Sequence, residues 1–170
     1  MSGASLGSIE KLAAHHDIRQ FDCGKDILNR FLQRFALINQ AANGAQTYVL
    51  CRTDRTVAAY YSLVVGAVEH AAAPSRVGQG LARHAIPVML LARLAIDRNE
   101  QRRGLGKALL KDALLRTAQA AEIAGIRALL VHAKDEEARA WYLRFDFEPS
   151  PTDPFHLFLL MKDIKALTLS

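Results

Sequence analysis

The segment from residue 88 to residue 125 constrains the fold of this chain more than any other. It begins with a nearly continuous apolar run, Val88–Ile96, which is typical of a central strand covered on both faces. A basic turn with two glycines follows, and apolar residues then recur at helical spacing from Leu105 to Ala118, with Gly125 as a stop signal. This order of elements predicts an α/β arrangement in which the turn joins a buried strand to a long helix.

The rest of the chain adds further strands and helices. Apolar and β-branched runs predict strands over 47–52, 57–68, 127–132 and 155–161, and helices are expected over 24–37 and 135–144. The first helix is expected to be amphipathic and basic, with one apolar face formed by Ile27, Leu28, Phe31, Leu32 and Phe35. Residues 71–85 predict a basic surface loop. Because the 170 residues contain no internal repeat or linker, we expect one mixed α/β domain over 1–170, with 1–8 a frayed end and structure beginning near Ile9.

Composition excludes several classes of protein. The two cysteines, Cys23 and Cys51, form no CxxC pair, and the six histidines lack metal-ligand spacing, so we expect no disulfide scaffold and no metal. No segment approaches the roughly 20 apolar residues that span a bilayer, and we expect a soluble, cytoplasmic protein. The 22 Lys and Arg residues against 17 Asp and Glu give a net charge of +5, which favours a phosphate-bearing ligand.

The turn after the apolar strand has the chemistry of a phosphate site. Gly104 and Gly106 allow the backbone to approach an anion closely, and the start of the following helix offers free N–H groups. Arg102, Arg103 and Lys107 add positive charge.

Two common phosphate loops are excluded by residue identity. A Walker A loop needs glycine where this chain has Gln101, and Ser or Thr where it has Ala108. A dinucleotide fingerprint needs glycine at the position of Leu109.

The pattern Gln101-x-x-Gly104-x-Gly106 resembles the pyrophosphate loop of the Gcn-related N-acetyltransferase (GNAT) superfamily. The resemblance implies a mixed, mostly antiparallel twisted sheet flanked by helices, with a splayed strand pair that forms a cleft for acetyl-coenzyme A. It implies that the backbone of Leu94, Ala95 and Ile96 pairs with the pantetheine arm of this co-substrate. The residues that would hold its phosphates are Gln101, Arg102, Arg103, Gly104, Leu105, Gly106 and Lys107.

A second resemblance, to the GNAT toxins of bacterial toxin–antitoxin pairs (the TacT/AtaT type), spans nearly the whole chain. It rests on His16-Asp17, Phe21–Gly24, Pro87–Asp97, Gly125–Ala133 and the ending Ala138–Pro154. These toxins acetylate the amino acid of aminoacyl-tRNA, and their catalytic tyrosine corresponds to Tyr142. One departure is Asp146, since relatives often carry glycine before the final phenylalanine of this ending.

Proton transfer gives Tyr142 a chemical role that does not depend on the family. When an amine attacks a thioester, the departing thiolate needs a proton, and a phenol with a pKa near 10 can donate it to a thiol group with a pKa of about 8.5. An α-amino acceptor, with a pKa of about 7.7–8.0, is partly neutral at pH 7 and needs little help from a protein base. If the resemblance is set aside, the sequence favours interpreting Tyr142 as a packing residue beside Trp141 and Phe145.

Three further expectations concern polar residues. His132 ends a strand and is either a base or a satisfied residue at the edge of the core. Arg93, inside an apolar strand, either contacts the substrate or forms an ion pair, because an unpaired buried guanidinium is costly. A track for tRNA phosphates is expected over Lys25, Arg30, Arg34, Arg76, Arg83 and Arg93, although a solvated basic surface explains each residue equally well.

Together these features predict an N-acetyltransferase toxin that transfers acetyl from acetyl-coenzyme A to the α-amino group of aminoacyl-tRNA, with Tyr142 as general acid. The resemblance implies a ribbon-helix-helix antitoxin that neutralises the toxin, operator DNA bound only through their complex, and a homodimer. The alternatives are a GNAT enzyme for a small amine or a protein N-terminus, and a non-catalytic module that binds acetyl-coenzyme A or RNA.

Overall fold

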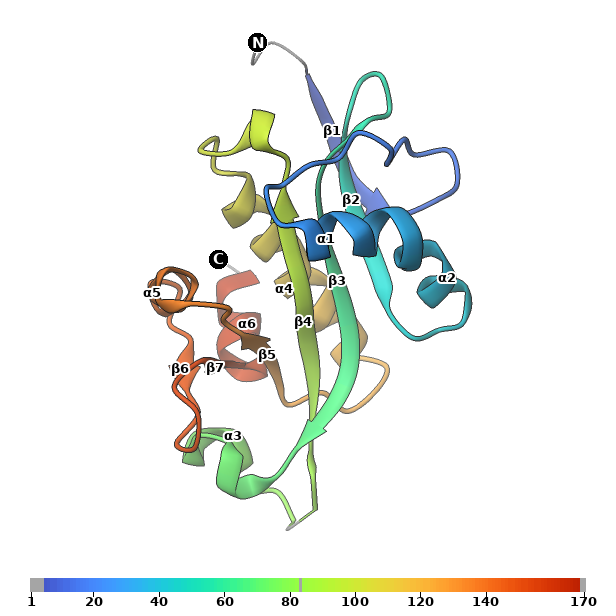
Figure 1. The fold of residues 1–170 in the computed structure, drawn as a ribbon. Coiled ribbons are helices and arrows are strands. Elements are labelled where there is room, and N and C mark those ends of the chain that lie inside the picture. The colour runs from blue at the N-terminus through green and yellow to red at the C-terminus, as the bar shows by residue number, and fades with distance from the viewer. Residues whose placement is uncertain (1–4, 83, 169–170) are drawn as a thin grey trace. The chain divides into compact units, whose positions relative to one another are not determined.

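The computed structural model describes residues 5–82 and 84–168. In chain order the elements are β1 (Leu6–Lys11), α1 (Asp26–Arg30), the π-helix η1 (Phe31–Phe35), α2 (Ala36–Ala41), β2 (Gln46–Arg52), β3 (Val57–Val68), the 3₁₀ helix η2 (His70–Ala72), α3 (Ser75–Gly78), β4 (Ile86–Ile96), the 3₁₀ helix η3 (Arg98–Glu100), α4 (Leu105–Ala121), β5 (Ala128–His132), α5 (Glu136–Leu143), β6 (Glu148–Pro149), β7 (His156–Leu160) and α6 (Met161–Thr168) (Figure 1).

The strands form a seven-stranded sheet in the order β1-β2-β3-β4-β5-β7-β6. The β1–β2, β2–β3, β5–β7 and β6–β7 pairs are antiparallel, whereas β4 and β5 are parallel. The predicted mixed, mostly antiparallel sheet with flanking helices is therefore confirmed. The pairing of β4 with β5 ends at Leu91, five residues before β4 itself ends, and the predicted cleft between splayed strands stays a prediction.

The chain divides into two compact units, which are described separately. Unit 1 contains the chain up to Val64 and residues Ala92–Ala113, and unit 2 contains Val65–Leu91 and the chain from Leu114 onward. Strands β3 and β4 and helix α4 each continue from one unit into the other. The single domain expected over 1–170 stays a prediction.

Two adjacent tyrosines on β3 show how the sheet of unit 1 is covered. Successive side chains of a strand point to opposite faces. The Tyr60 hydroxyl donates a hydrogen bond to the carbonyl oxygen of Leu28 in α1 (2.7 Å), and the Tyr61 hydroxyl donates one to the Asp112 carboxylate in α4 (2.5 Å). Helix α1 therefore covers one face of β3 and α4 covers the other (Figure 1). The core on the α1 face comprises Leu12, Phe21, Phe31, Leu32, Ala36, Val49, Val57, Tyr60 and Ala95.

The helix predicted over 24–37 is present but is interrupted by the π-helix η1. A π-helical turn contains more residues than an α-helical turn, so the apolar stripe changes direction where η1 begins. Phe31 and Leu32 are buried, whereas Ile27 is 73% exposed and Phe35 is 51% exposed. The expectation of one continuous apolar face was therefore wrong for these two residues.

Unit 2 is built on β5, which pairs with β4 on one side and with β7 on the other. Its predicted basic loop contains two short helices, η2 and α3, whose Val77 is buried in the core. The Arg127 guanidinium holds this segment by donating from Nε to the carbonyl oxygen of Val77 (2.6 Å) and from Nη2 to that of Gln79 (2.8 Å). Backbone acceptors thus order a segment that lacks a periodic apolar pattern.

The ends of the described chain differ from the expectation. Strand β1 begins at Leu6, where it pairs with Arg52, so structure begins before Ile9. Backbone pairing with β2 holds this segment even though a bulge separates Leu6 from Ile9. At the other end, α6 follows β7 directly and was not predicted. Among the described residues, no helix has the length and apolar character needed to cross a bilayer.

We predict that Tyr60→Phe lowers the free energy of unfolding by about 1 kcal/mol, because the Leu28 carbonyl would lose its buried donor. Urea denaturation monitored by circular dichroism measures the change. An unchanged midpoint and slope would show that this hydrogen bond does not help to hold α1 on the sheet.

Candidate functional site

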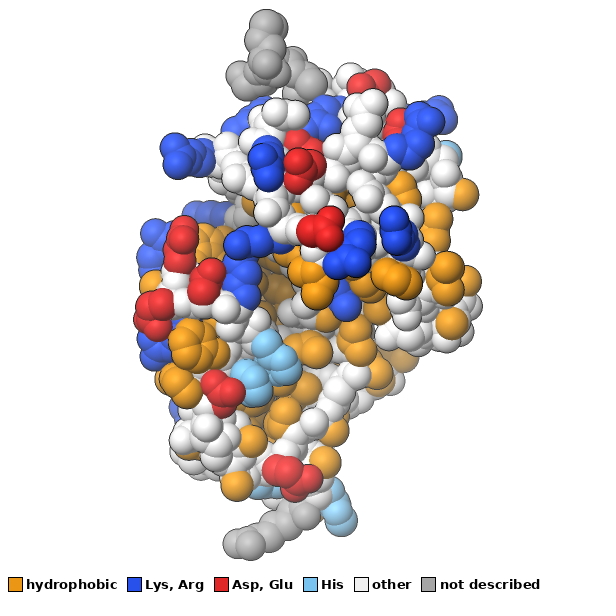
Figure 2. Space-filling view, viewed as in Figure 1, with side chains coloured by type: hydrophobic (Ala, Val, Ile, Leu, Met, Phe, Trp, Pro, Cys, Tyr) orange, Lys and Arg blue, Asp and Glu red, His pale blue; other side chains and the backbone are white. Residues whose placement is uncertain are grey.

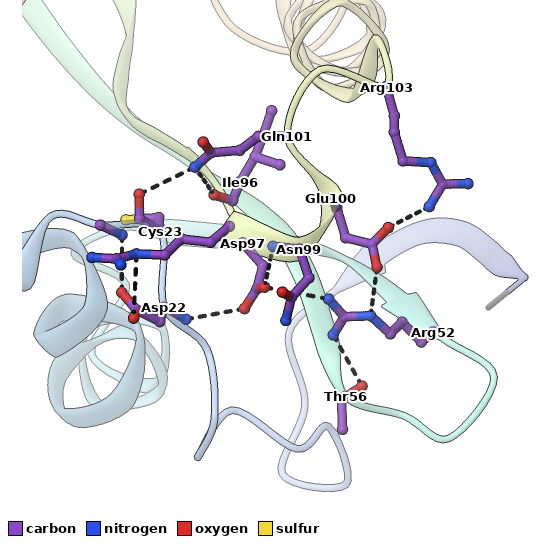
Figure 3. A network of polar contacts seen from close by, with 12 residues as sticks. Asp22, Cys23, Arg52, Thr56, Ile96, Asp97, Asn99, Glu100, Gln101 and Arg103 are labelled. Atoms are coloured by element: carbon purple, nitrogen blue, oxygen red, sulfur yellow. Dashed lines mark hydrogen bonds and ion pairs between the residues drawn. The ribbon is translucent and has the colours of Figure 1, made fainter. Parts of the chain in front are cut away.

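Asp97 fixes the direction of the chain where it leaves β4. Its carboxylate accepts hydrogen bonds from the backbone N–H of Asn99 (3.0 Å) and from the backbone N–H of Asp22 (3.1 Å) (Figure 3). Its own N–H donates to the carbonyl oxygen of Ala58 (2.8 Å). The side chain therefore caps η3 and ties it to the segment that precedes α1.

Glu100 is a buried carboxylate, 3% exposed, directly before the phosphate turn. Arg52 of β2 donates to it from Nε at 2.7 Å, and Arg103 donates to its other oxygen (Figure 3). Burial raises the pKa of Glu100, but the hydrogen bonds and charges of the two arginines outweigh this effect and hold the pKa below its ordinary value of 4.5. Arg52 also donates to the Thr56 hydroxyl (3.2 Å) and lies 3.5 Å from the Asp97 carboxylate. We call Arg52, Asp97, Glu100 and Arg103 the ion cluster.

The side chain of Gln101 points back toward the strand. Its amide donates to the carbonyl oxygens of Ile96 (2.9 Å) and Cys23 (3.2 Å) (Figure 3). Gln101 therefore closes the turn, and its side-chain N–H groups face protein acceptors. Sequence reasoning placed Gln101 in the turn correctly but gave no sign of this bonding or of the ion cluster, because both join residues that are far apart in the chain.

The turn leaves its backbone open to a ligand. Arg102 and Gly104 adopt positive φ values of 68° and 76°. A methyl side chain placed at Gly104 would meet no heavy atom within 4 Å. Helix α4 begins at Leu105, whose side chain is buried, and the exposed side chains of Arg102 and Lys107 flank the turn. Open backbone, the start of a 17-residue helix and two exposed cations fit the phosphates of acetyl-coenzyme A.

The strand residues expected beside the pantetheine arm alternate in burial. Ala95 is buried in the core of unit 1, while Leu94 and Ile96 are half-buried. The backbone pairing of Leu94, Ala95 and Ile96 with the pantetheine arm stays a prediction.

In unit 2, Tyr142 lies on α5, which Asp135 caps by accepting from the backbone N–H of Ala138 (2.8 Å). Its side chain is mostly enclosed, and its ring meets the Trp141 and Phe147 rings edge to face at 4.9 and 5.4 Å. Its hydroxyl makes no hydrogen bond to another residue that the structure describes. Burial raises the pKa of Tyr142 to about 12, so the phenol keeps its proton at neutral pH.

Asp146 stands at the position where the ending of related toxins often carries glycine. It adopts φ 67°, in the left-handed region where glycine is favoured and where aspartate is tolerated better than most residues. The turn between α5 and Phe147 is thus retained without glycine.

His132 stacks on His156 across the β5–β7 pair, with ring centroids 3.9 Å apart. Burial and the neighbouring His156 ring lower the pKa of His132. A neutral imidazole at the end of β5 fits both the base and the edge-of-core alternatives.

The basic residues expected to bind tRNA differ in their surroundings. Arg76 forms ion pairs with Glu148 and Asp163 and braces unit 2, while Arg30 pairs with Asp26 at 3.0 Å. Lys25 and Arg34 are exposed, Arg93 lies over the Phe31 ring, and Arg83 lies outside the described residues. Figure 2 shows basic side chains interleaved with acidic ones on the face that it presents. Net positive charge therefore does not make every one of these cations available to RNA.

Glu10, His15 and His16 form a cluster whose potential ligand atoms lie within 4.8 Å of one another. Nδ1 of His16 accepts from the backbone N–H of Ala13 (2.9 Å), and Nε2 lies 2.6 Å from the Glu10 carboxylate. Since Nδ1 is an acceptor, Nε2 carries the ring proton and donates a hydrogen bond to the Glu10 carboxylate. This arrangement leaves neither nitrogen of His16 with a lone pair for a metal ion.

Comparison with known proteins assigns the family. Residues 45–149 match the acetyltransferase (GNAT) domain. This chain belongs to the GNAT acetyltransferase family. It is 48% identical over 167 residues to the tRNA-acetylating toxin of Mycobacterium tuberculosis (strain ATCC 25618 / H37Rv), with 98% of each chain covered.

Solved GNAT structures agree with this assignment. AtaT complexed with acetyl-methionyl-tRNAfMet superposes with a TM-score of 0.89 at 34% identity, covering 96% of this chain and 99% of AtaT. An AtaT mutant toxin bound to the C-terminus of the antitoxin AtaR and to acetyl-CoA gives a TM-score of 0.82 at 31% identity, covering 98% and 99% of the two chains. The fold and the acetyltransferase class expected from the sequence are confirmed.

We predict that Arg52→Gln lowers the free energy of unfolding by about 3 kcal/mol, because it leaves the buried Glu100 carboxylate with one arginine. Acetyl-coenzyme A binding should weaken at least tenfold in the folded fraction, as measured by calorimetry at a temperature well below the unfolding transition. The double variant Arg52→Gln/Glu100→Gln should lose less stability than the two single changes added together.

The matched control is Arg19→Gln, which removes the same charge from an exposed pair with Asp17. It should leave stability and coenzyme binding near the wild-type values. Strict additivity of Arg52→Gln and Glu100→Gln would contradict a structural role for their ion pair.

Proposed function

We propose that this chain transfers the acetyl group of acetyl-coenzyme A to the α-amino group of an aminoacyl-tRNA and so blocks translation. The observation that carries the proposal is its 48% identity to the tRNA-acetylating toxin over 98% of both chains. The open turn supplies the coenzyme-binding chemistry that such a transfer needs.

The coenzyme phosphates bind at the turn through backbone N–H groups from Gly104 to Lys107, aided by the exposed side chains of Arg102 and Lys107. Arg103 is shared with Glu100 and contributes chiefly by holding the turn in shape. Gln101 acts in the same way through Ile96 and Cys23. In this proposal the extended backbone of Leu94–Ile96 receives the pantetheine arm.

The chemical step forms a C–N bond and breaks a C–S bond. The neutral α-amine attacks the acetyl carbonyl, Tyr142 donates its phenolic proton to the departing thiolate, and the proton lost from the new amide nitrogen restores the phenol through solvent. A phenol with a pKa of about 12 is a weak acid for a thiolate in water. The same burial that raises the pKa of Tyr142 also raises that of an enclosed thiol, which brings the two groups closer in acidity.

The basic surface contributes to tRNA binding through its uncommitted members. Lys25 and Arg34 are exposed, so their charge is available to phosphates. Arg30 needs to leave Asp26 to take part, and Arg83 remains a candidate. Arg76 is already held by two carboxylates and is assigned a structural role in place of the expected RNA contact.

Partners follow from the same proposal. A cell that contains a protein blocking its translation needs a neutralising partner, and an AtaT mutant toxin is seen in complex with the C-terminus of the antitoxin AtaR. We propose a ribbon-helix-helix antitoxin for this chain, operator DNA bound through the toxin–antitoxin complex, and a homodimeric toxin acting in the cytoplasm.

The proposal predicts that purified protein transfers labelled acetyl from acetyl-coenzyme A to total aminoacyl-tRNA and not to deacylated tRNA or to free amino acids. Acid-precipitable label, followed by mass analysis of the released amino acids, measures transfer and acceptor preference together. Absence of label on charged tRNA, with coenzyme binding intact, would overturn the proposal. Label on small amines or on protein N-termini would then identify the other GNAT acceptor classes.

Tyr142→Phe should lower the rate of transfer by about 10²–10³-fold, because the ring is retained while the proton donor is lost. Affinity for acetyl-coenzyme A, measured by calorimetry, should stay within about twofold. Tyr48→Phe, which removes a phenol elsewhere, should keep wild-type activity. Wild-type rates for Tyr142→Phe would show that another group protonates the thiolate.

A further inference from the structure

Arg93 differs from most arginines of this protein in its surroundings. Within the described residues its guanidinium has no carboxylate within 4.0 Å and no hydrogen bond to protein. It lies instead over the ring of Phe31, 3.6 Å from the ring centroid. By contrast, carboxylates engage Arg19, Arg30, Arg52, Arg76, Arg98, Arg103 and Arg139.

The cost of this arrangement indicates a ligand. Arg93 is half-buried in an otherwise apolar strand, and a desolvated cation without an acceptor is unfavourable. The Phe31 ring offsets part of the cost and fixes the plane of the guanidinium, because Phe31 is itself locked in the core of unit 1. Five N–H donors in a fixed plane, with no acceptor among the protein residues that the structure describes, form a receptor for an oxygen-bearing group of a substrate.

The position of Arg93 on β4 favours the acceptor substrate over the coenzyme phosphates. Arg93 stands three residues before Ile96, which is about 10 Å along a strand, and the phosphate turn begins only after η3. This step rests on the proposed function, in which Leu94–Ile96 hold the pantetheine arm. The thioester then lies at the Arg93 end of that arm, where the aminoacyl group must arrive.

We propose that Arg93 is a catalytic residue that donates a hydrogen bond to the carbonyl oxygen of the aminoacyl ester and, by its charge, keeps the adjacent α-amino group neutral. A positive charge within about 4–6 Å disfavours the ammonium form and lowers the pKa of the amine. The released ammonium proton passes to solvent before attack, so the site needs no carboxylate base. Without a substrate oxygen to accept its hydrogen bonds, the guanidinium of Arg93 would be unfavourable in this apolar strand.

The groups around Arg93 do not compete for this role. Tyr60 of β3 lies close enough to be influenced by it: burial and Cys23 raise the pKa of Tyr60, and the charge of Arg93 opposes them. The Tyr60 hydroxyl is already committed to Leu28. On η1 the charged side chain is the exposed Arg34, and the next titratable residue after Arg93 along the chain is Asp97, which directly follows β4 and is held in the ion cluster.

The test compares the pH dependence of kcat in Arg93→Gln and Arg93→Lys with that of the wild type on saturating aminoacyl-tRNA. Between about pH 5.5 and 8.5, the limb of kcat on the acidic side reports the amine in the bound complex. We expect Arg93→Gln to move this limb upward by about one pH unit, with a roughly tenfold loss at pH 6 that shrinks toward pH 8.5. Arg93→Lys, which keeps the charge, should keep the limb near its wild-type place.

The control variants distinguish the effect of the Arg93 charge on kcat from the effects of misfolding and of a change in net charge. Phe31→Leu, which keeps an apolar side chain in the core, should move the limb in the same direction by a smaller amount, because the guanidinium loses its fixed plane. Arg19→Gln should leave the limb unchanged. Melting temperature and acetyl-coenzyme A affinity are measured for each variant, so that the folded fraction is known.

The outcomes distinguish this inference from the proposed function. A wild-type protein that does not acetylate charged tRNA overturns both. A wild-type protein that does, together with an Arg93→Gln variant whose loss is equal at every pH, overturns the role of Arg93 alone. If Arg93→Gln does not fold, an unchanged limb in Phe31→Leu likewise overturns the role of Arg93.

Discussion

The buried ion pair between Arg52 and Glu100 is the interaction on which the proposed coenzyme-binding turn depends. A carboxylate this deeply buried is tolerated only when cations and donors surround it, and here Arg52 and Arg103 provide them. Their arrangement fixes the short helix η3 between β4 and the phosphate turn. Asp97 caps the start of η3, and the side chain of Gln101 holds the residue after η3 against the end of β4. The backbone around Gly104 is therefore ordered before a ligand binds.

The two substrates make different demands on the protein, and its charges are arranged accordingly. The coenzyme needs a rigid turn, so Arg52 and Arg103 are committed to Glu100, whereas Arg102 and Lys107 stay exposed beside the turn. The acceptor brings its own nucleophile, an α-amine that is partly neutral at physiological pH, so catalysis requires little more than a proton for the leaving thiolate and protection of the neutral amine. Tyr142 and Arg93 are the residues to which we assign these two tasks.

Local signals in the sequence predicted the local features of the structure. The strand, the glycine turn and the long helix between residues 88 and 121 depend on neighbouring residues, and they are present as expected. Pairings between distant residues could not be predicted: Arg52 meets Glu100 across 48 positions, and Arg76 meets Asp163 across 87. For this reason Arg76 looked available to RNA, and the ion cluster escaped notice. The π-helical turn at Phe31 also has no signature in an apolar period read as α-helical.

Hydrogen–deuterium exchange across residues 97–106 tests most directly whether the ion cluster forms the coenzyme site in advance. We predict that peptides covering η3, where the backbone N–H groups of Arg98, Asn99 and Glu100 are hydrogen-bonded, are already protected in the free protein, and that acetyl-coenzyme A adds protection chiefly from Gly104 onward. Arg52→Gln should abolish the protection seen in the free protein. Rapid exchange throughout this segment in the free wild-type protein, with protection gained only on binding, would contradict a preformed site.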